Sequence, residues 1–399
     1  MFDSLTPGNF ALFGLSFLAF TLLIIFVGAS ISRKQRQDAE SKTDGHSHDE
    51  DFDQALDEFD PDHNGHVHSH NCKYDQEEQR RTAALPRPLI PVDNLPAPNP
   101  RVQAALDKVS LTDMQTMLSH LTGDKPYVLN GETKTMVTRN SHTDGIGEAA
   151  KYMIASYQTA GITAELWPYT VRGNQYNNVR YIIPGKKNPN KVLVLGAHLD
   201  STAGAPWKKE AKAPGAEDDG SGTTALYNAA LAIVALGGLD CTVHIVHFTG
   251  EEQGLWGSYA YADWLSREVK AKGLTVIGMI EMDMVGYCPN PAHRLDVHDE
   301  VDRNGSHAIT IAFFQQIARY KLNLNPFDTH NLSVKDRSDH AGFLDKKWPA
   351  VLLSEEFTDT AFYPHYHTTR DTIDKINFPY LREVTRAVIA VSCEMGGLS

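Results

Sequence analysis

Acidic and imidazole side chains follow three apolar runs in the middle of the chain. His198 and Asp200 come at the end of the first run. Glu251 and Glu252 follow the second, and Asp283 follows the third. Short apolar runs bounded by glycine and turn residues are typical of buried strands in a helix-covered sheet, whose ligands gather at its carboxyl edge. Because imidazoles and carboxylates bind zinc and related cations, the pattern predicts a metalloenzyme.

Neighbouring residues at these strand ends differ in the chemistry that they can perform. Residues i and i+2 of an extended chain share a face, so Asp200 can bind the second ring nitrogen of His198 and fix its tautomer. Two adjacent buried carboxylates, Glu251 and Glu252, lose solvation unless a cation compensates them. One of them can then bind a metal while the other, with a raised pKa, transfers a proton.

Two further segments add candidate ligands. Asp218 and Asp219 lie in a loop rich in glycine and proline before an expected helix. One carboxylate can cap that helix while its neighbour bridges metals. Near the C-terminus, His365 and His367 stand in Tyr-Pro-His-Tyr-His-Thr-Thr-Arg-Asp-Thr and offer a second imidazole. We interpret His365 as a histidine outside the ligand set.

Segments with helical and strand periodicity alternate after the proline-rich stretch. The expected helices include residues 102–121, 145–160, 222–236 and 380–395, and the expected strands include 192–195, 241–248 and 274–282. Such alternation implies a largely parallel sheet that is covered on both faces. The sequence therefore predicts one α/β domain over residues 101–399, a three-layer sandwich with a mixed, mainly parallel central sheet flanked by helices.

Six segments, in this order and spacing, resemble the co-catalytic di-zinc exopeptidases, the family of bacterial leucyl aminopeptidases, glutamate carboxypeptidase, glutaminyl cyclase and the transferrin receptor. The segments are His-Leu-Asp-Ser-Thr, Ala-Pro-Gly-Ala-Glu-Asp-Asp-Gly-Ser-Gly, Phe-Thr-Gly-Glu-Glu-Gln-Gly-Leu-Trp-Gly-Ser, Glu-Met-Asp-Met, Ser-Asp-His-Ala-Gly-Phe and Tyr-His-Thr-Thr-Arg-Asp-Thr. The resemblance covers about residues 101–399.

The resemblance implies two Zn²⁺ ions that are bridged by Asp218. It implies that His198 and Asp283 complete one zinc site, and that Glu252 and His367 complete the other.

The same resemblance implies roles for residues beside these ligands. Glu251 would be the general base, Asp200 would orient the first histidine, and Asp219 would shape its loop through a cis peptide. Met284 and Tyr366, each next to an implied ligand, are expected to line the pocket for the terminal side chain.

These roles describe a metallopeptidase, most simply an aminopeptidase that removes the N-terminal residue of peptide substrates through a metal-bridging water. A carboxypeptidase or dipeptidase of the same family stays open, because Lys208, Lys209 and Lys212 could form a rim for a substrate carboxylate. Acyl transfer of the glutaminyl cyclase kind and a non-catalytic, receptor-like role are disfavoured because every implied ligand is present. The net charge of −13 argues against binding of nucleic acid.

The N-terminal stretch over residues 9–31 contains no charged residue and is long enough to cross a bilayer as a helix. The sequence therefore predicts a single-pass transmembrane anchor and a membrane localisation. Arg33, Lys34 and Arg36 favour a cytoplasmic catalytic domain, whereas the habit of the family favours the extracytoplasmic side, so the side stays open.

Residues 38–80 form an acidic, histidine-rich spacer that accounts for −11 of the net charge. Residues 60–65 fit the start of an EF-hand loop, but Asn71 stands where the bidentate glutamate is needed. The histidines over residues 46–70 suggest weak binding of divalent metals. A calcium-binding relic, a zinc-holding tract and a disordered spacer all stay open. The proline-rich residues 81–100 are expected to be a linker.

Overall fold

The computed structural model describes residues 90–299, 304–329, 334, 336–358 and 360–398. The predicted anchor, the predicted spacer and residues 81–89 of the predicted linker lie outside these residues, so the assignments of the spacer and the linker stay predictions.

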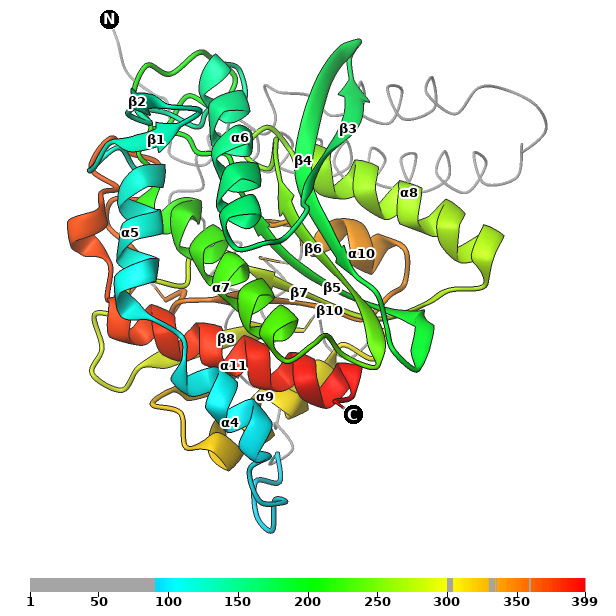
Figure 1. The fold of residues 1–399 in the computed structure, drawn as a ribbon. Helices are drawn as coiled ribbons and strands as arrows, with labels where there is room; N and C mark the ends of the chain where they lie inside the picture. The colour runs from blue at the N-terminus through cyan, green and yellow to red at the C-terminus, as the bar shows by residue number, and fades with distance from the viewer. Residues whose placement is uncertain (1–89, 300–303, 330–333, 335, 359, 399) are drawn as a thin grey trace, which may run out of the picture. The chain divides into compact units, whose positions relative to one another are not determined.

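An eight-stranded mixed sheet lies at the centre of the described domain, with its strands in the order β3-β4-β6-β5-β7-β10-β8-β9 (Figure 1). The strands are β3 (Glu165–Val171), β4 (Asn174–Ile183), β5 (Asn188–His198), β6 (Cys241–Phe248), β7 (Thr275–Met282), β8 (Arg294–His298), β9 (Asn325–Thr329) and β10 (Ala350–Ser354). Parallel pairing joins β6, β5, β7 and β10 in the middle, and β8 with β9 at one edge. The other pairings are antiparallel, so the predicted mixed sheet is confirmed.

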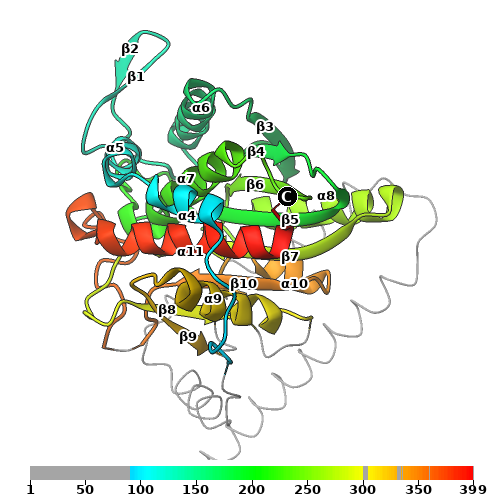
Figure 2. The ribbon, with the colours of Figure 1, turned by 60° about the horizontal axis from the view of Figure 1, so that its bottom comes forward.

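Helices cover both faces of this sheet, which explains why its central strands are apolar throughout (Figure 2). Along β5, Leu193 and Leu195 join a core cluster with residues of α7 and α11, while Val192 and Val194 join a second cluster with residues of α8 and α10. The alternation of β-strand side chains thus places one core on each side of the sheet. The helices are α4 (Pro100–Asp107), α5 (Leu111–Leu121), α6 (Asp144–Thr159), α7 (Gly222–Ala235), α8 (Trp256–Lys272), α9 (His307–Tyr320), α10 (Ala341–Asp345) and α11 (Phe378–Gly396).

The expected single helix over residues 102–121 is interrupted. Ser110 has an extended backbone, and its hydroxyl accepts a hydrogen bond from the backbone N–H of Asp113, which is the geometry of a helix N-cap. Helix α4 has already ended at Asp107, and α5 begins at Leu111, directly after this serine. Beyond α5, a small hairpin of β1 (Tyr127–Leu129) and β2 (Glu132–Lys134) stands apart from the main sheet.

The helices of the described domain do not support the membrane prediction. No helix in the described part of the chain is both long enough and apolar enough to cross a bilayer. The longest, α11, has 19 residues but carries four charged ones, Arg382, Glu383, Arg386 and Glu394. The predicted single-pass membrane localisation is contradicted by this finding and does not stand; the segment behind it, residues 9–31, lies outside the described residues.

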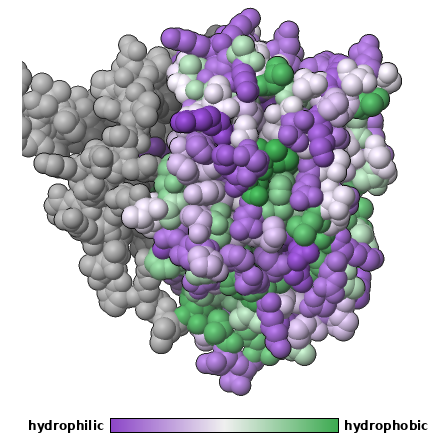
Figure 3. Space-filling model, turned by 90° about the vertical axis from the view of Figure 1, so that its left-hand side faces the viewer, coloured by the Kyte–Doolittle hydropathy of each residue, from purple (hydrophilic) through white to green (hydrophobic). Residues whose placement is uncertain are grey.

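The apolar residues of the domain are mostly internal. On the face drawn in Figure 3, hydrophilic residues predominate and hydrophobic ones occur in small groups between them. The sheet is therefore a buried scaffold, and its strand ends are the places where polar side chains can gather.

Candidate metal centre

The carboxyl ends of the central parallel strands bring the predicted ligands together. His198 is the last residue of β5, and Asp283 directly follows β7. Glu252 lies in the turn after β6, and Asp218 lies in η1 (Ala216–Ser221), the irregular turn that leads into α7. His367 comes from the loop between β10 and α11. Because β5, β6 and β7 are adjacent and parallel, residues that are far apart in the chain meet at one edge of the sheet.

Asp218 lies between two imidazoles. Its Oδ1 is 3.0 Å from Nε2 of His198, and its Oδ2 is 3.1 Å from Nε2 of His367. The same nitrogen of His367 lies 3.0 Å from Oε2 of Glu252. Nε2 of His198 lies 3.6 Å from Oδ1 of Asp283. The donor atoms thus form two groups that share one carboxylate.

Asp219 is close to this centre, but its carboxylate accepts hydrogen bonds from backbone N–H groups. Its Oδ1 accepts hydrogen bonds from the N–H groups of Gly222 and Met284, at 2.8 and 3.2 Å, and its Oδ2 accepts one from the N–H of His198 at 3.2 Å. The peptide bond between Asp218 and Asp219 is cis, as the resemblance implied. Asp219 therefore shapes the loop, and Asp218 is the aspartate that faces both imidazoles.

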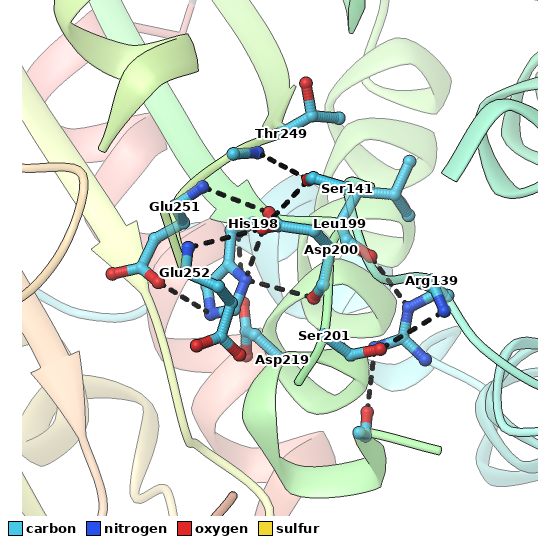
Figure 4. Close-up of polar contacts among 12 residues, drawn as sticks. Arg139, Ser141, His198, Leu199, Asp200, Ser201, Asp219, Thr249, Glu251 and Glu252 are labelled. Carbon is cyan, nitrogen blue, oxygen red and sulfur yellow. Dashed lines mark hydrogen bonds and ion pairs between the residues drawn. The ribbon is translucent and has the colours of Figure 1, made fainter. Parts of the chain in front are cut away.

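Asp200 links two of the strand ends (Figure 4). It is fully buried, and its carboxylate accepts hydrogen bonds from the backbone N–H groups of Glu251 and Glu252 and from the Ser141 hydroxyl, each at 3.2 Å. Its Oδ1 also lies 3.6 Å from Nδ1 of His198, and its carbonyl oxygen lies 3.2 Å from the same nitrogen. The contact that we expected with His198 is present, but the stronger role of Asp200 is to hold the glutamate turn.

The two glutamates differ in their surroundings. The side chain of Glu252 is 2% exposed and contacts His367, whereas that of Glu251 is 11% exposed, with Oε2 at 4.0 Å from Nε2 of His198. Burial raises the pKa of Glu252 to about 7 and that of Glu251 well above its ordinary value. Glu251 is thus the glutamate that can reach a molecule in the site.

The surrounding carboxylates also determine the charge of the histidines. Burial alone lowers the pKa of both imidazoles. The carboxylates of Glu251 and Asp283 outweigh burial and raise the pKa of His198 well above its ordinary value. In the same way, Glu252 and Asp218 raise the pKa of His367 to about 10. Without a metal ion, protons on these rings therefore offset part of the negative charge of the surrounding carboxylates.

The buried guanidinium of Arg139 fastens the loops that carry the acids, and the sequence analysis missed it (Figure 4). Its Nε donates to the carbonyl oxygen of Leu199 at 2.7 Å. Nη1 donates to those of Leu121 and Pro214 at 2.9 and 2.6 Å, and Nη2 to that of Gly215 at 2.8 Å. No local signal could reveal this role, because its acceptors are backbone carbonyls 18 to 76 residues away.

Asp371 holds the bridging loop from the opposite side. Its Oδ2 accepts a hydrogen bond from the N–H of Asp218 at 3.1 Å, and its Oδ1 accepts from the N–H of Glu217 and the hydroxyl of Tyr363, both at 2.9 Å. The segment that contains the second imidazole thus also fixes the backbone of Asp218.

The two predicted pocket residues lie in different surroundings. Tyr366 is 39% exposed, and its ring stacks on that of His367 with 3.7 Å between the centroids. Met284 is only 3% exposed. His365 makes none of the centre's ion-pair contacts among the described residues. Tyr366 is therefore available to a ligand, whereas Met284 is mainly a buried part of the wall.

The residues present fit zinc. Two imidazoles and several carboxylates supply nitrogen and oxygen ligands of the kind that zinc prefers. Among the described residues, Oε1 of Glu252 and Oδ1 of Asp283 are buried without a hydrogen-bond partner, which is costly unless a cation binds them. Two sets of donor atoms at this centre lie within 4.8 Å of one another: those of His198, Asp218 and Glu252, and those of His198, Asp219 and Asp283.

Comparison with known proteins agrees with this fold. The model of peptidase family M28 matches residues 178–392, more than half of the chain. A probable zinc metalloprotease of Leptosphaeria maculans is 30% identical over 74% of this chain and 76% of its own length. The chain belongs to peptidase family M28.

Further relatives and structures are similar over part of their length or in fold alone. A probable leucine aminopeptidase of Arthroderma otae is 30% identical over 55% of this chain, and the match spans only 57% of that relative. The LapA aminopeptidase of Legionella pneumophila has the same fold, with a TM-score of 0.61, 20% identity and coverage of 79% and 78% of the two chains. A glutaminyl cyclase of Porphyromonas gingivalis shares it too, with a TM-score of 0.54, 17% identity and coverage of 71% and 98%.

The hydrogen bonds of Arg139 to four backbone carbonyl oxygens, which we call the clamp, lead to a prediction about stability. Replacing Arg139 by Lys removes the planar fork and leaves several buried carbonyls without a donor, so we expect the free energy of unfolding to fall by about 2–4 kcal/mol. Urea denaturation of the chelator-treated protein measures this change without a contribution from bound metal. Arg267→Lys, at an exposed position of α8, is the matched control and should change stability by less than about 0.5 kcal/mol. Equal stabilities of the two variants would contradict the clamp.

The raised pKa of His367 predicts how the stability of the metal-free protein depends on pH. The folded protein keeps this imidazolium up to about pH 10, whereas the unfolded chain loses the proton near its ordinary value of about 6.5. The stabilisation is therefore complete below about pH 6.5 and is lost as the pH rises to about 10. Urea denaturation across this range, with chelator present, should show the fall, and His367→Gln should make it shallower, with the raised pKa of His198 responsible for part of the remainder. His365→Gln is the control and should leave the slope unchanged; a flat profile for the parent protein would refute the expectation.

Proposed function

We propose that this chain is a zinc aminopeptidase that holds two metal ions and releases the N-terminal residue of peptides. The observation that supports this most directly is the position of Asp218, whose two oxygens lie 3.0 and 3.1 Å from two different imidazoles. A carboxylate placed in this way is suited to bridge two cations. The family and the aminopeptidase relatives support the same activity.

In this proposal the five ligands divide between the two ions. Asp218 belongs to both, His198 and Asp283 complete one site, and Glu252 and His367 complete the other. A zinc pair held by these residues would lower the pKa of a bound water, polarise the scissile carbonyl and stabilise negative charge on its oxygen. Asp200 and Asp219 are proposed to act mainly through the backbone: their carboxylates accept hydrogen bonds from N–H groups and hold the strand ends in place.

Glu251 is the residue that we propose as general base. It is more exposed than its neighbour, and no described side chain donates a hydrogen bond to its carboxylate. Burial raises its pKa, which makes it able to take a proton and return it to the leaving amine. Glu252, which contacts His367 at 3.0 Å, is placed for metal binding instead.

The pocket for the terminal side chain is proposed to include Tyr366 and Met284. Tyr366 presents an exposed aromatic ring that is held over His367, and Met284 follows the ligand Asp283 directly. An aromatic ring and a thioether would favour a large apolar terminal residue.

The role of Glu251 is tested by Glu251→Gln. This change keeps the size of the side chain but removes the base, so kcat for release of leucine from leucyl peptides should fall by about 10²–10⁴-fold. Zinc content should remain at the parent level, because Glu251 is not proposed as a ligand. Glu132→Gln, whose side chain is 75% exposed on β2, is the matched control and should keep parent activity.

N-acetylated and C-terminally amidated peptides decide between the peptidase classes. An aminopeptidase loses activity when the N-terminus is acetylated and tolerates the amide. Cleavage that survives acetylation but requires a free C-terminus would instead establish a carboxypeptidase. A zinc-loaded protein that hydrolyses none of these peptides would refute the proposal and favour acyl transfer or a receptor-like role.

Two bound ions are tested by zinc content. Parent protein should retain two equivalents of zinc after dialysis, Asp283→Asn about one, and Asp218→Asn fewer than one, because Asp218 is proposed to serve both ions. Atomic emission spectroscopy of the purified variants measures this. Asp107→Asn, on the exposed surface of α4, is the control and should retain both. One equivalent in the parent protein would overturn the two-metal arrangement.

A further inference from the structure

The loop over residues 203–213 lies beside the candidate metal centre. It connects the segment that contains Asp200 to the turn that contains Asp218. Gln253, next to Glu252, donates from Nε2 to the carbonyl oxygen of Pro206 at 3.0 Å. A Cβ atom on Gly204 would lie 3.2 Å from the carbonyl oxygen of His367. The loop therefore contacts residues next to two of the proposed ligands.

The one acid of this loop is turned inward. Glu210 is 9% exposed, and its carboxylate accepts hydrogen bonds from the N–H groups of Ala203 and Ala205, both at 2.9 Å. It also accepts from the hydroxyl of Thr202 at 2.6 Å and the amide of Asn140 at 2.9 Å. These four hydrogen bonds hold the loop in place, and they direct the carboxylate of Glu210 into the protein, away from the surface of the loop.

The basic residues of the loop remain on the surface. Lys208, Lys209 and Lys212 are exposed. Within the part of the chain that the structure describes, no carboxylate lies within 4.0 Å of their amines. The loop thus carries three positive charges that no described acid pairs.

Aromatic rings surround Trp207, the residue that precedes Lys208 in this loop. The Trp207 ring lies 5.8 Å from that of Trp256, and His142 lies 6.5 and 6.0 Å from these two rings. The guanidinium of Arg172, in the turn between β3 and β4, lies 6.0 Å from the Trp207 ring. Burial lowers the pKa of His142, Asp200 raises it, and Lys209 lowers it, which indicates that the lysine acts at the same ring as an acid of the centre.

We propose that Lys208, Lys209 and Lys212 form a cationic rim that binds a carboxylate of the substrate at a distance from the bond that is cleaved. The inference rests on the proposed peptidase function and specifies its substrates as peptides that carry negative charge beyond the first residue. Positive charge at the mouth of a cleft raises the local concentration of anions and steers them inward. Such a carboxylate can belong to an Asp or Glu side chain or to the C-terminus of a short peptide.

The test compares three leucyl peptides that differ only in carboxylates. They are Leu-Ala-Glu-Glu amide, Leu-Ala-Gln-Gln amide and Leu-Ala-Gln-Gln with a free C-terminus. The parent protein should prefer a carboxylate-bearing peptide over the neutral amide by about three- to tenfold in kcat/KM at low salt, and the preference should shrink at high ionic strength. The first peptide tests whether side-chain carboxylates are recognised, and the third tests whether the C-terminal carboxylate is recognised.

A triple variant with Lys208→Gln, Lys209→Gln and Lys212→Gln should reduce this ratio to about one. The matched control removes the same charge at exposed lysines on the opposite edge of the sheet and on α8, with Lys186→Gln, Lys191→Gln and Lys270→Gln. The control should keep the parent ratio. An equal loss in both variants would mean that only net charge matters, and an unchanged ratio in the first would exclude the rim.

Binding separates the failure of the rim from the failure of the proposed function. Fluorescently labelled Leu-Ala-Glu-Glu amide is titrated with zinc-loaded Glu251→Gln protein, with and without the three loop substitutions. If the parent protein hydrolyses no peptide, the proposed function fails, but weaker binding after loss of the three lysines still supports the rim. Equal affinity with and without the lysines would overturn the rim, whatever the result for hydrolysis.

Discussion

Repulsion among closely packed carboxylates is the constraint on which the rest of the site depends. Asp218, Glu251, Glu252 and Asp283 surround two imidazoles whose nitrogens lie 3.0 to 4.0 Å from their oxygens. Two like charges about 4 Å apart repel by about 4 kcal/mol at an effective dielectric constant of 20. Protons on the imidazoles offset part of this in the metal-free protein, and divalent cations would offset it more completely. A centre of this kind is stable only if its acids cannot move apart.

Backbone hydrogen bonds prevent that movement. Asp200, Asp219 and Asp371 each accept hydrogen bonds from at least two backbone N–H groups, and these include the N–H groups of Glu251, Glu252, His198 and Asp218. Arg139 performs the converse task by donating to carbonyl oxygens of the same loops. Charged groups that would repel one another are thus held by neutral backbone dipoles, which leave the facing oxygens available for metal.

Much of the fold and the acids at the strand ends could be predicted from the sequence because both are local signals. The apolar runs indicate buried strands, and the residues that follow them, His198, Glu251 and Asp283, indicate which acidic and imidazole side chains lie at the strand ends. The break between α4 and α5 was missed because helical spacing continues across it, and only the extended backbone and N-cap of Ser110 show that a second helix begins there. Arg139 was missed for a deeper reason: its acceptors are carbonyl oxygens that only the folded chain brings together. The N-terminal anchor was inferred from hydropathy alone, and no described helix is apolar enough to support it.

The fold does not decide the reaction, since an aminopeptidase and a glutaminyl cyclase both share it. The choice between these reactions must therefore depend on side chains that can vary without disturbing the fold. The loop over residues 203–213 meets this condition. Glu210 holds it through contacts that leave Lys208 and Lys209 at the surface, and the flanking Asp200 and Asp218 are fixed by hydrogen bonds to other segments. The composition of the loop can therefore change while the metal ligands stay in place. We therefore propose that the buried strand ends determine the chemistry and that this loop contributes to selectivity.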